Sequence, residues 1–152
     1  MASNRHLGRI IALQTLYEYE FRVDCEDTDA SLVEILKHNL GRYKETIGDQ
    51  AFVEKLVEGV VEHKLLLDDT IQPIAPEWPI AQIARVDRMI LRMAIFELQY
   101  LQDLVPPKVA INEAVELAKA FGSDNSSKFV NGVLGTAYRT LFGDQTDANT
   151  KV

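Results

Sequence analysis

Apolar residues recur along this chain every three or four positions, the spacing typical of amphipathic helices. No segment has a convincing strand pattern. The spacing therefore predicts an all-α fold, with about seven helices in two packed helical sub-bundles. The expected helices cover approximately residues 5–22, 31–44, 49–69, 80–84, 86–101, 109–121 and 127–142.

Prolines indicate the expected boundary between the sub-bundles. Three of the five prolines lie in TIQPIAPEWP, residues 70–79. Proline cannot continue a helix, and it pushes the preceding residue toward extended geometry. We therefore expect a single domain, 1–152, that consists of an N-terminal sub-bundle (1–69), a proline-rich connector (70–79), a C-terminal sub-bundle (80–142) and a polar tail (143–152).

One segment, residues 128–135, carries two conflicting signals. Its sequence is KFVNGVLG, and Asn-Gly between apolar residues is typical of a β-hairpin. On a helical wheel, however, the apolar residues form one face about 140° wide that continues beyond the segment. We expect a helix, because an isolated hairpin is marginal in water. Its buried face would consist of Phe129, Val130, Val133, Leu134, Ala137 and Leu141.

The opposite face of this helix carries two glycines. Gly132 and Gly135 lie there, with Asn131 beside them. Lys128 and Arg139 flank the glycines at the two ends. Each glycine costs a helix about 1 kcal/mol relative to alanine. Either another helix packs against the bare backbone, or Lys128, Asn131 and Arg139 hold a phosphate or an RNA backbone there, and the sequence leaves both alternatives open.

The start of the chain offers a second group of basic side chains. Arg5 and Arg9 are four residues apart on one helix face, and His6 lies beside them. Such a pair is usually a solvated face. A binding role gains weight if this end of the chain lies near Lys128 in space.

The net charge of −7 is unevenly distributed. Residues 24–77 hold 13 acidic and 5 basic residues, whereas the segments on either side are close to neutral. A polyanion such as RNA would therefore bind the two ends of the chain and not its middle.

Other features exclude several functional classes. Cys25 is the only cysteine, so neither an internal disulfide nor a thiolate zinc site is expected. The chain shows no secretion signal and no apolar run of membrane-spanning length, and the cytoplasm is the default location. It also lacks a phosphate loop, a paired-histidine motif and a nucleophile elbow. We expect a protein that is not an enzyme and has no cofactor or metal.

Three segments together resemble a known family. Residues 105–135 read VPPKVAINEAVELAKAFGSDNSSKFVNGVLG, residues 86–98 read VDRMILRMAIFEL, and residues 5–21 read RHLGRIIALQTLYEYEF. The first is similar to the C-terminal signature of the NusB family of bacterial transcription antitermination factors. The second resembles the preceding helix of that family, and the third resembles its first helix. Residues 23–79 carry little of the signature.

The resemblance implies a helical adaptor that binds RNA. Its implied ligand is boxA-type single-stranded RNA in nascent ribosomal transcripts. Its implied partner is the small-subunit ribosomal protein NusE, within an antitermination complex on RNA polymerase. Carried over onto this sequence, the RNA-binding residues would be Arg5, His6, Arg9, Tyr17, Arg92, Lys128 and Asn131. The NusE-binding residues would be Phe21, Asp87, Asp124 and Asn125.

Three alternatives stay open at this point. The same fold resembles the RNA-binding domain of certain ribosomal-RNA cytosine methyltransferases, although the chain ends at Val152 without room for a methyl-donor domain. A purely protein-binding helical adaptor is the second alternative. The third is a homodimer that buries Tyr17 or Phe21.

Overall fold

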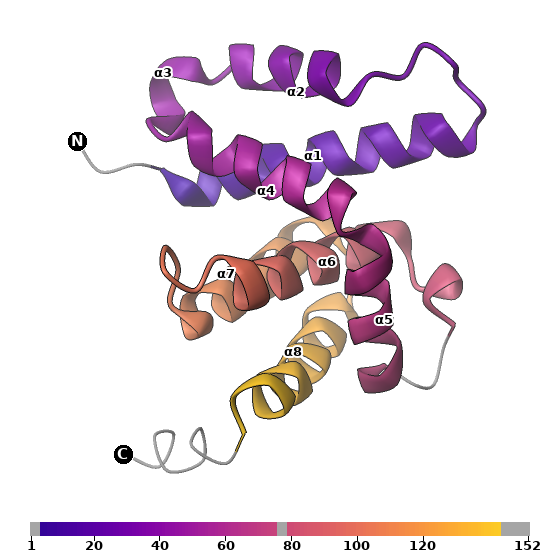
Figure 1. The fold of residues 1–152 in the computed structure, drawn as a ribbon, viewed down its shortest axis with the longest axis vertical. Coiled ribbons are helices and arrows are strands. Elements are labelled where there is room, and N and C mark those ends of the chain that lie inside the picture. The colour runs from indigo at the N-terminus through magenta and orange to yellow at the C-terminus, as the bar shows by residue number, and fades with distance from the viewer. Residues whose placement is uncertain (1–3, 76–78, 144–152) are drawn as a thin grey trace. The chain divides into compact units, whose positions relative to one another are not determined.

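The computed structural model describes residues 4–75 and 79–143, most of which are helical (Figure 1). Within these residues the chain forms eight α-helices, one short 3-10 helix (η1) and no strand, which confirms the all-α prediction. None of the helices in these two ranges is long and apolar enough to cross a membrane. The elements are α1 (Arg5–Asp24), α2 (Leu32–Gly41), α3 (Lys44–Ile47), α4 (Gln50–Glu62), α5 (Lys64–Ile74), η1 (Ile80–Gln82), α6 (Arg85–Tyr100), α7 (Pro107–Phe121) and α8 (Ser126–Phe142).

The chain divides into two compact units between Glu62 and His63. Unit 1 contains α1 to α4, and unit 2 contains α5 to α8 with η1. The division lies earlier than the predicted connector, because the helix expected over 49–69 ends at Glu62 and a new one begins at Lys64. That helix, α5, includes Pro73, and only one helical residue follows the proline, which cannot continue a helix. The remainder of the predicted connector, 76–78, and the tail over 144–152 lie outside the described residues.

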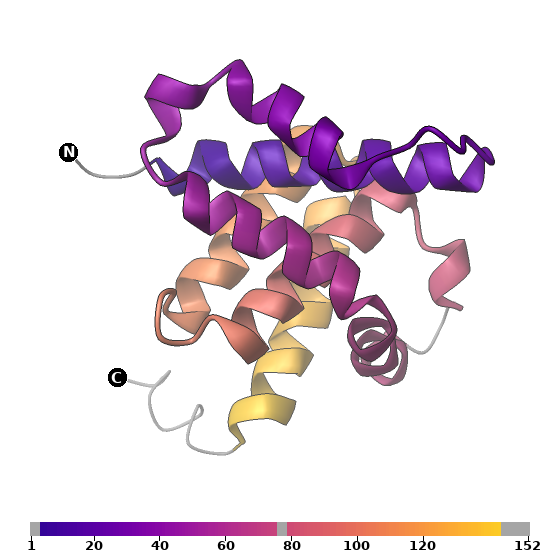
Figure 2. The same ribbon diagram turned by 45° about the horizontal axis from the view of Figure 1, so that its top comes forward.

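Unit 1 is organised around α1, which packs against α2, α3 and α4 (Figures 1 and 2). Inside it, the Asn39 side-chain amide donates a buried hydrogen bond of 3.0 Å to Thr15 Oγ1, which joins α2 to α1. A Cβ at Gly8 would lie 2.9 Å from Val53 Cγ2, so the absence of a side chain lets α1 and α4 approach closely. The fully buried apolar residues include Ile11, Ala12, Val53, Leu56 and Val57.

Unit 2 is organised around α6, which packs against α5, α7 and α8. Helical spacing alone predicts that Val86, Ile90, Met93 and either Ile95 or Leu98 point inward. Instead, every residue from Met89 to Leu98 is buried, because three helices surround α6. Val86, at the start of the helix, is only partly buried.

The start of α6 is fixed by two polar side chains. Arg88 Nη1 donates a hydrogen bond of 3.0 Å to the carbonyl oxygen of Ala81 in η1. The Gln72 side-chain carbonyl accepts a hydrogen bond of 2.9 Å from the backbone N–H of Ile80. These contacts hold η1 against α5 and α6, and they position residues 82–84 beside the pocket described below.

The connection from α7 to α8 depends on Gly122 and Ser126. A Cβ at Gly122 would lie 2.4 Å from Ser126 Oγ, so no side chain fits there. The backbone of Gly122 is extended, with φ −92°, and the glycine is needed for space and not for the left-handed conformation expected of a helix stop. Ser126 is buried, and its Oγ accepts a hydrogen bond of 2.9 Å from the backbone N–H of Ser123.

The helix prediction for residues 128–135 is confirmed, since they lie within α8. Val130, Val133, Leu134 and Ala137 are buried as expected. Two further members of the predicted face, at positions 129 and 141, are partly buried.

Candidate nucleic-acid and protein interface

Arg5 is held at the start of α1 by α4. Its Nη2 lies 3.6 Å from Asp49 Oδ2, and about a third of each side chain is exposed. Its guanidinium carbon also lies 4.8 Å from the centre of the Phe52 ring. Asp49 in turn accepts a hydrogen bond of 3.1 Å from the backbone N–H of Phe52 at the start of α4. Arg5 is thus positioned, and part of its side chain stays accessible to a ligand.

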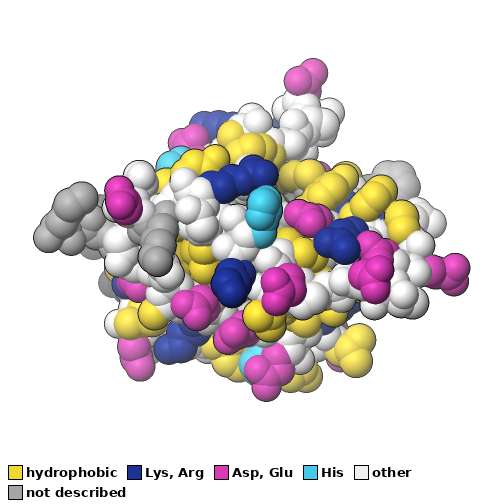
Figure 3. All heavy atoms as spheres, turned by 90° about the horizontal axis from the view of Figure 1, so that it is seen from above, with side chains coloured by type: hydrophobic (Ala, Val, Ile, Leu, Met, Phe, Trp, Pro, Cys, Tyr) yellow, Lys and Arg dark blue, Asp and Glu magenta, His cyan; other side chains and the backbone are white. Residues whose placement is uncertain are grey.

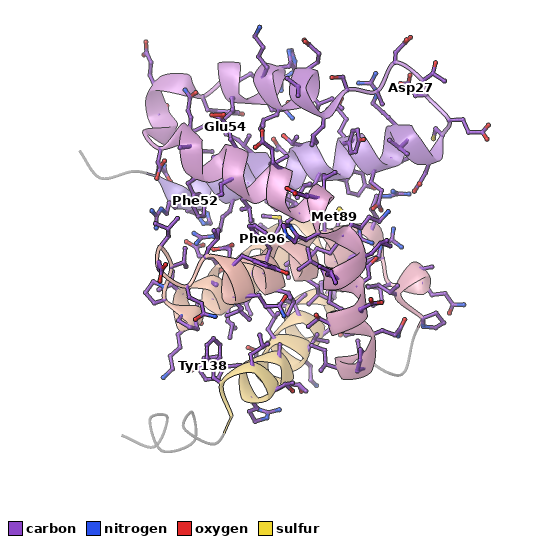
Figure 4. The ribbon with its side chains drawn as sticks, in the orientation of Figure 1. Asp27, Phe52, Glu54, Met89, Phe96 and Tyr138 are labelled. Carbon is purple, nitrogen blue, oxygen red and sulfur yellow. The ribbon has the colours of Figure 1, made fainter. Side chains whose placement is uncertain are left out.

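Arg9 does not lie on the surface, contrary to our expectation. Only 2% of the residue is exposed, and its guanidinium carbon lies 5.1 Å from the centre of the same Phe52 ring (Figure 4). A guanidinium stacked on an aromatic ring and buried in this way stabilises the structure. It is not available to an RNA phosphate, whereas the neighbouring His6 is exposed.

Arg92 is likewise buried, which does not favour its predicted contact with RNA. Its Nε and Nη2 donate hydrogen bonds of 2.7 and 2.9 Å to the two carboxylate oxygens of Asp68. Its side chain is 5% exposed. This two-point geometry is typical of an arginine–carboxylate pair, and here it ties α6 to α5.

The glycine face of α8 is open. A Cβ at Gly132 would meet nothing within 4 Å, and one at Gly135 would meet only Arg139 Nη1 at 3.7 Å. No helix in the described part of unit 2 therefore packs against these glycines, which does not favour the first of the two alternatives. Lys128 and Asn131 on this helix are exposed.

Tyr17 and Phe21 are four residues apart on α1 and belong to one side of it. They are 38% and 49% exposed. Exposed aromatic side chains at this spacing are suited to stacking or to protein contact.

The loop after α1 is fixed by an ion pair. Arg22 Nε donates a hydrogen bond of 2.8 Å to Asp27 Oδ2 (Figure 4). The Arg22 hydrogen bond lowers the pKa of Asp27 below its ordinary value, and the hydrogen bond from the backbone N–H of Asp29 adds to the effect. The same pair raises the pKa of Arg22.

A pocket of about 260 Å³ in unit 2 brings together two of the predicted partner-binding residues, Asp87 and Asn125. Asp87 is 8% exposed, and its Oδ1 is buried without a hydrogen-bond partner among the described residues. The first turn of α6, where Asp87 lies, favours a negative charge through the helix dipole. The pocket therefore offers a buried acceptor to an incoming N–H donor. Its lining is completed by Gln82, Ile83, Ala84, Ser123, Ser126 and Phe129.

The other residues that line this pocket were not predicted from the sequence, and they include Ser126 and Phe129. Ser126 looked like one of several helix caps, and Phe129 looked like part of the core. Gly122 lies four residues before Ser126. This spacing could have indicated that the Ser126 side chain packs closely against the glycine, because a glycine often lets a nearby side chain approach. Asp124 is exposed and does not line the pocket, and Phe21 belongs to unit 1.

The charged side chains form no single-sign surface in the view of Figure 3. Lys and Arg side chains are interspersed there with Asp, Glu and hydrophobic ones. Among the described residues, no group of three or more His, Cys, Asp or Glu side chains could hold a metal ion.

Comparison with known proteins decides the family. A model of the NusB family matches residues 6–139. The chain belongs to the NusB family. Among similar members, the transcription antitermination protein NusB of Chloroflexus aggregans is 46% identical over 150 residues, which cover 98% of this chain and 95% of that protein. The NusB protein of Dehalococcoides mccartyi strain CBDB1 is 42% identical over 93% of this chain and 94% of that protein.

Solved structures of NusB proteins share the fold. The T. maritima NusB structure matches with a TM-score of 0.77 and 32% identity over 90% of this chain and 91% of that chain. A crystal structure of the antitermination factors NusB and NusE in complex with dsRNA matches with a TM-score of 0.76. Its identity is 26%, over 90% of this chain and 96% of that chain.

Proposed function

We propose that this chain is an RNA-binding transcription antitermination factor that pairs with NusE and binds boxA-type RNA of nascent ribosomal transcripts. The match of residues 6–139 to the NusB family carries the proposal. The similarity to a solved complex of NusB, NusE and dsRNA supports both the partner and the class of nucleic acid. The assignment to an antitermination complex on RNA polymerase rests on the family alone.

The residues proposed to contact RNA are fewer than the resemblance implied, and each unit contributes some of them. Arg5 and Lys128 supply phosphate contacts, with His6 and Asn131 beside them. The bare backbone at Gly132 lets a phosphate or sugar approach α8 closely, and it supports this assignment because a Cβ there would meet no atom of the described part of unit 2 within 4 Å. Tyr17 stacks on an unpaired base, which is a common way for proteins to hold single strands.

Arg9 and Arg92 act indirectly in this proposal. Arg9 and Arg5 both lie over the Phe52 ring, so Arg9 helps to fix the start of α1 from which Arg5 projects. Arg92 stabilises the junction of α5 and α6 through Asp68.

The proposed NusE surface centres on the Asp87 pocket. The buried Asp87 carboxylate would accept a hydrogen bond from an arginine or lysine of NusE, because an unpaired buried acceptor gains most from a charged donor. Asn125 lines the same pocket, while Phe21 and Asp124 would add exposed contacts.

We further propose that the protein acts in the cytoplasm as an adaptor and not as an enzyme. Support comes from the sequence, in which we find no catalytic motif, and from the family name. Neither the methyltransferase-related domain nor the purely protein-binding adaptor is favoured by the relatives found.

The test measures RNA binding by the complex of this chain with purified NusE. Probes are a boxA-type single strand and the same sequence as a duplex. The double variant Arg5→Ala/Lys128→Ala should bind the preferred probe at least tenfold more weakly. The matched control Lys55→Ala/Lys108→Ala removes two exposed cations elsewhere and should change the affinity less than twofold.

Unchanged RNA binding by the Arg5→Ala/Lys128→Ala complex would contradict the proposed RNA surface. A separate arm uses Asp87→Asn, which should weaken NusE binding and leave the helical content unchanged. If neither RNA nor NusE binds the unmodified chain, the proposed function itself is wrong.

A further inference from the structure

Unit 1 contains a groove of about 450 Å³ between α2 and α4, to which the proposed function assigns no role. We define the α2–α4 groove by its two walls. The α2 wall is apolar and consists of Val33, Leu36 and Leu40. The α4 wall is polar and consists of Gln50, Glu54 and Glu58.

The α2 wall presents apolar surface to solvent. Val33 is 67% exposed, although it lies in the first turn of α2, while Leu36 and Leu40 form the deeper part of the wall. An exposed valine beside two leucines gives a continuous apolar strip along the helix, because residues three and four apart share one face.

The α4 wall presents a line of acceptors. Gln50, Glu54 and Glu58 are each four residues apart, so they follow one another along the same side of the helix. Figure 4 shows Glu54 on the side of α4 that faces α2. Two carboxylates at this spacing repel each other unless a cation lies near them.

No cation is paired with these carboxylates in the described part of unit 1. Neither Glu54 nor Glu58 forms an ion pair, and Lys37, which also lines the groove, forms none. The surrounding segment, residues 24–77, holds 13 acidic and 5 basic residues. The groove therefore attracts cations and repels a polyanion such as RNA.

We propose that the α2–α4 groove binds a basic amphipathic helix of a protein partner. Apolar side chains of that helix would lie against Val33, Leu36 and Leu40. Arginine or lysine side chains on its flank would pair with Glu54 and Glu58, in the way that amphipathic helices commonly occupy grooves. The lining of this groove shares no residue with the Asp87 pocket or with the residues assigned to RNA.

The dimensions of the groove fit such a helix. From Gln50 to Glu58 the α4 wall rises about 12 Å, which corresponds to a little over two helical turns of the partner. At Gly41, at the end of α2, a Cβ would meet nothing within 4 Å, so the groove is open at that end. A segment of about nine residues would therefore fill it without displacing the backbone.

The test uses NMR on the isotope-labelled full chain and a synthetic helical peptide. The probe peptide carries leucines at positions i, i+4 and i+7 and arginines on one flank. A shuffled peptide of the same composition lacks the apolar face. We expect the helical peptide to shift the amide signals of Val33, Leu40 and Gly41, and to bind at least tenfold more tightly than the shuffled peptide.

Charge reversal provides the second arm. The variant Glu54→Lys/Glu58→Lys should bind the helical peptide at least tenfold more weakly. The control Glu45→Lys/Asp103→Lys makes the same change in net charge at exposed positions outside the groove, and should change binding less than twofold. Circular dichroism should show unchanged helix content for both variants. In the complex with NusE, both variants should bind RNA with the same affinity.

Two results would overturn the proposal. One is that the helical peptide binds without shifting the amide signals of the groove residues, or that Glu54→Lys/Glu58→Lys and Glu45→Lys/Asp103→Lys lose the same amount of affinity for it. The other is concentration-dependent self-association that Glu54→Lys/Glu58→Lys abolishes, which would make a second copy of this chain the occupant. Neither result bears on the RNA affinity of Arg5→Ala/Lys128→Ala. The groove proposal can therefore fail while the proposed function stands, and the reverse also holds.

Discussion

The role of each arginine depends on what surrounds its guanidinium. Arg92 has its charge matched by Asp68 inside unit 2, Arg9 lies buried over Phe52, and Arg5 remains partly accessible. In the sequence all three are basic residues on helices, and periodicity alone does not distinguish them. The difference comes from partners that are far away in the chain.

The Arg92–Asp68 pair allows a prediction about stability. Arg92→Ala would leave a mostly buried carboxylate without its partner, and we expect a loss of about 3–5 kcal/mol in the free energy of unfolding. The control Lys119→Ala removes one member of an exposed ion pair and should cost less than about 0.5 kcal/mol. Urea denaturation measures both, and similar losses for the two variants would refute the structural role of Arg92.

The Arg22–Asp27 pair predicts how stability depends on pH. The pKa of Asp27 is lower in the folded chain than its ordinary value of 3.8, because Arg22 donates a hydrogen bond to the carboxylate. The pair therefore stabilises the fold above about pH 4, and this contribution is lost as the pH falls through the lowered pKa. Between pH 5 and pH 3, the free energy of unfolding measured by urea titration should fall less for Asp27→Asn than for the unmodified chain. Equal losses would show that the pair contributes nothing.

At the scale of single elements, close packing of α1 on α4 predicts an unusual response to alanine. Gly8→Ala would normally stabilise a helix by up to about 1 kcal/mol. Here the new Cβ would lie 2.9 Å from Val53 Cγ2, and we expect a net loss of about 1–2 kcal/mol through overpacking.

A double-mutant cycle checks the cause. In the Val53→Ala background the overlapping methyl group is absent, so Gly8→Ala should there be neutral or stabilising. Gly132→Ala is the control, because the same change on the open face of α8 meets no atom within 4 Å and should stabilise. If Gly8→Ala lowers stability equally in both backgrounds, the contact with Val53 is not responsible.

Local patterns predicted the elements better than their boundaries. Helical spacing gave the buried side of α8 correctly because that side follows from residues close in sequence. The break between α4 and α5 carries no proline or glycine, since His63 stands there, and so it had no sequence signal. The burial of α6 on nearly every side depends on three separate helices, which periodicity within one helix does not reveal.

At the scale of the whole molecule, few of the cations predicted to bind RNA are accessible to it. The net charge is −7, and two of the expected basic contacts, Arg9 and Arg92, are buried. With two or three phosphate contacts from Arg5, Lys128 and His6, we expect the chain alone to bind single-stranded RNA with a log–log salt slope no steeper than about −2. Filter binding between low and moderate salt measures the slope, and a value near −5 would require a denser basic surface than the proposed one.

The candidate site was predictable only in part, because its state depends on packing between elements that are distant in the sequence. Resemblance of the segments supplied Asp87 and Asn125, and the fold places them in one pocket. The state of the Asp87 carboxylate, buried and unpaired, follows from packing around α6 and could not be derived from its sequence neighbours. The openness of the glycine face also required the structure, because composition alone favoured a packed helix there.

The buried Asp87 Oδ1, which has no hydrogen-bond partner among the described residues, lowers the stability of the chain and favours binding of a partner. A buried acceptor without a donor weakens the isolated chain, and the deficit disappears when a partner supplies the donor. Selection for heat resistance alone would therefore tend to recover apolar residues at position 87. Variants isolated in that way should fold more firmly and recruit the partner less well, so a gain in melting temperature at this position would mark a defect in assembly.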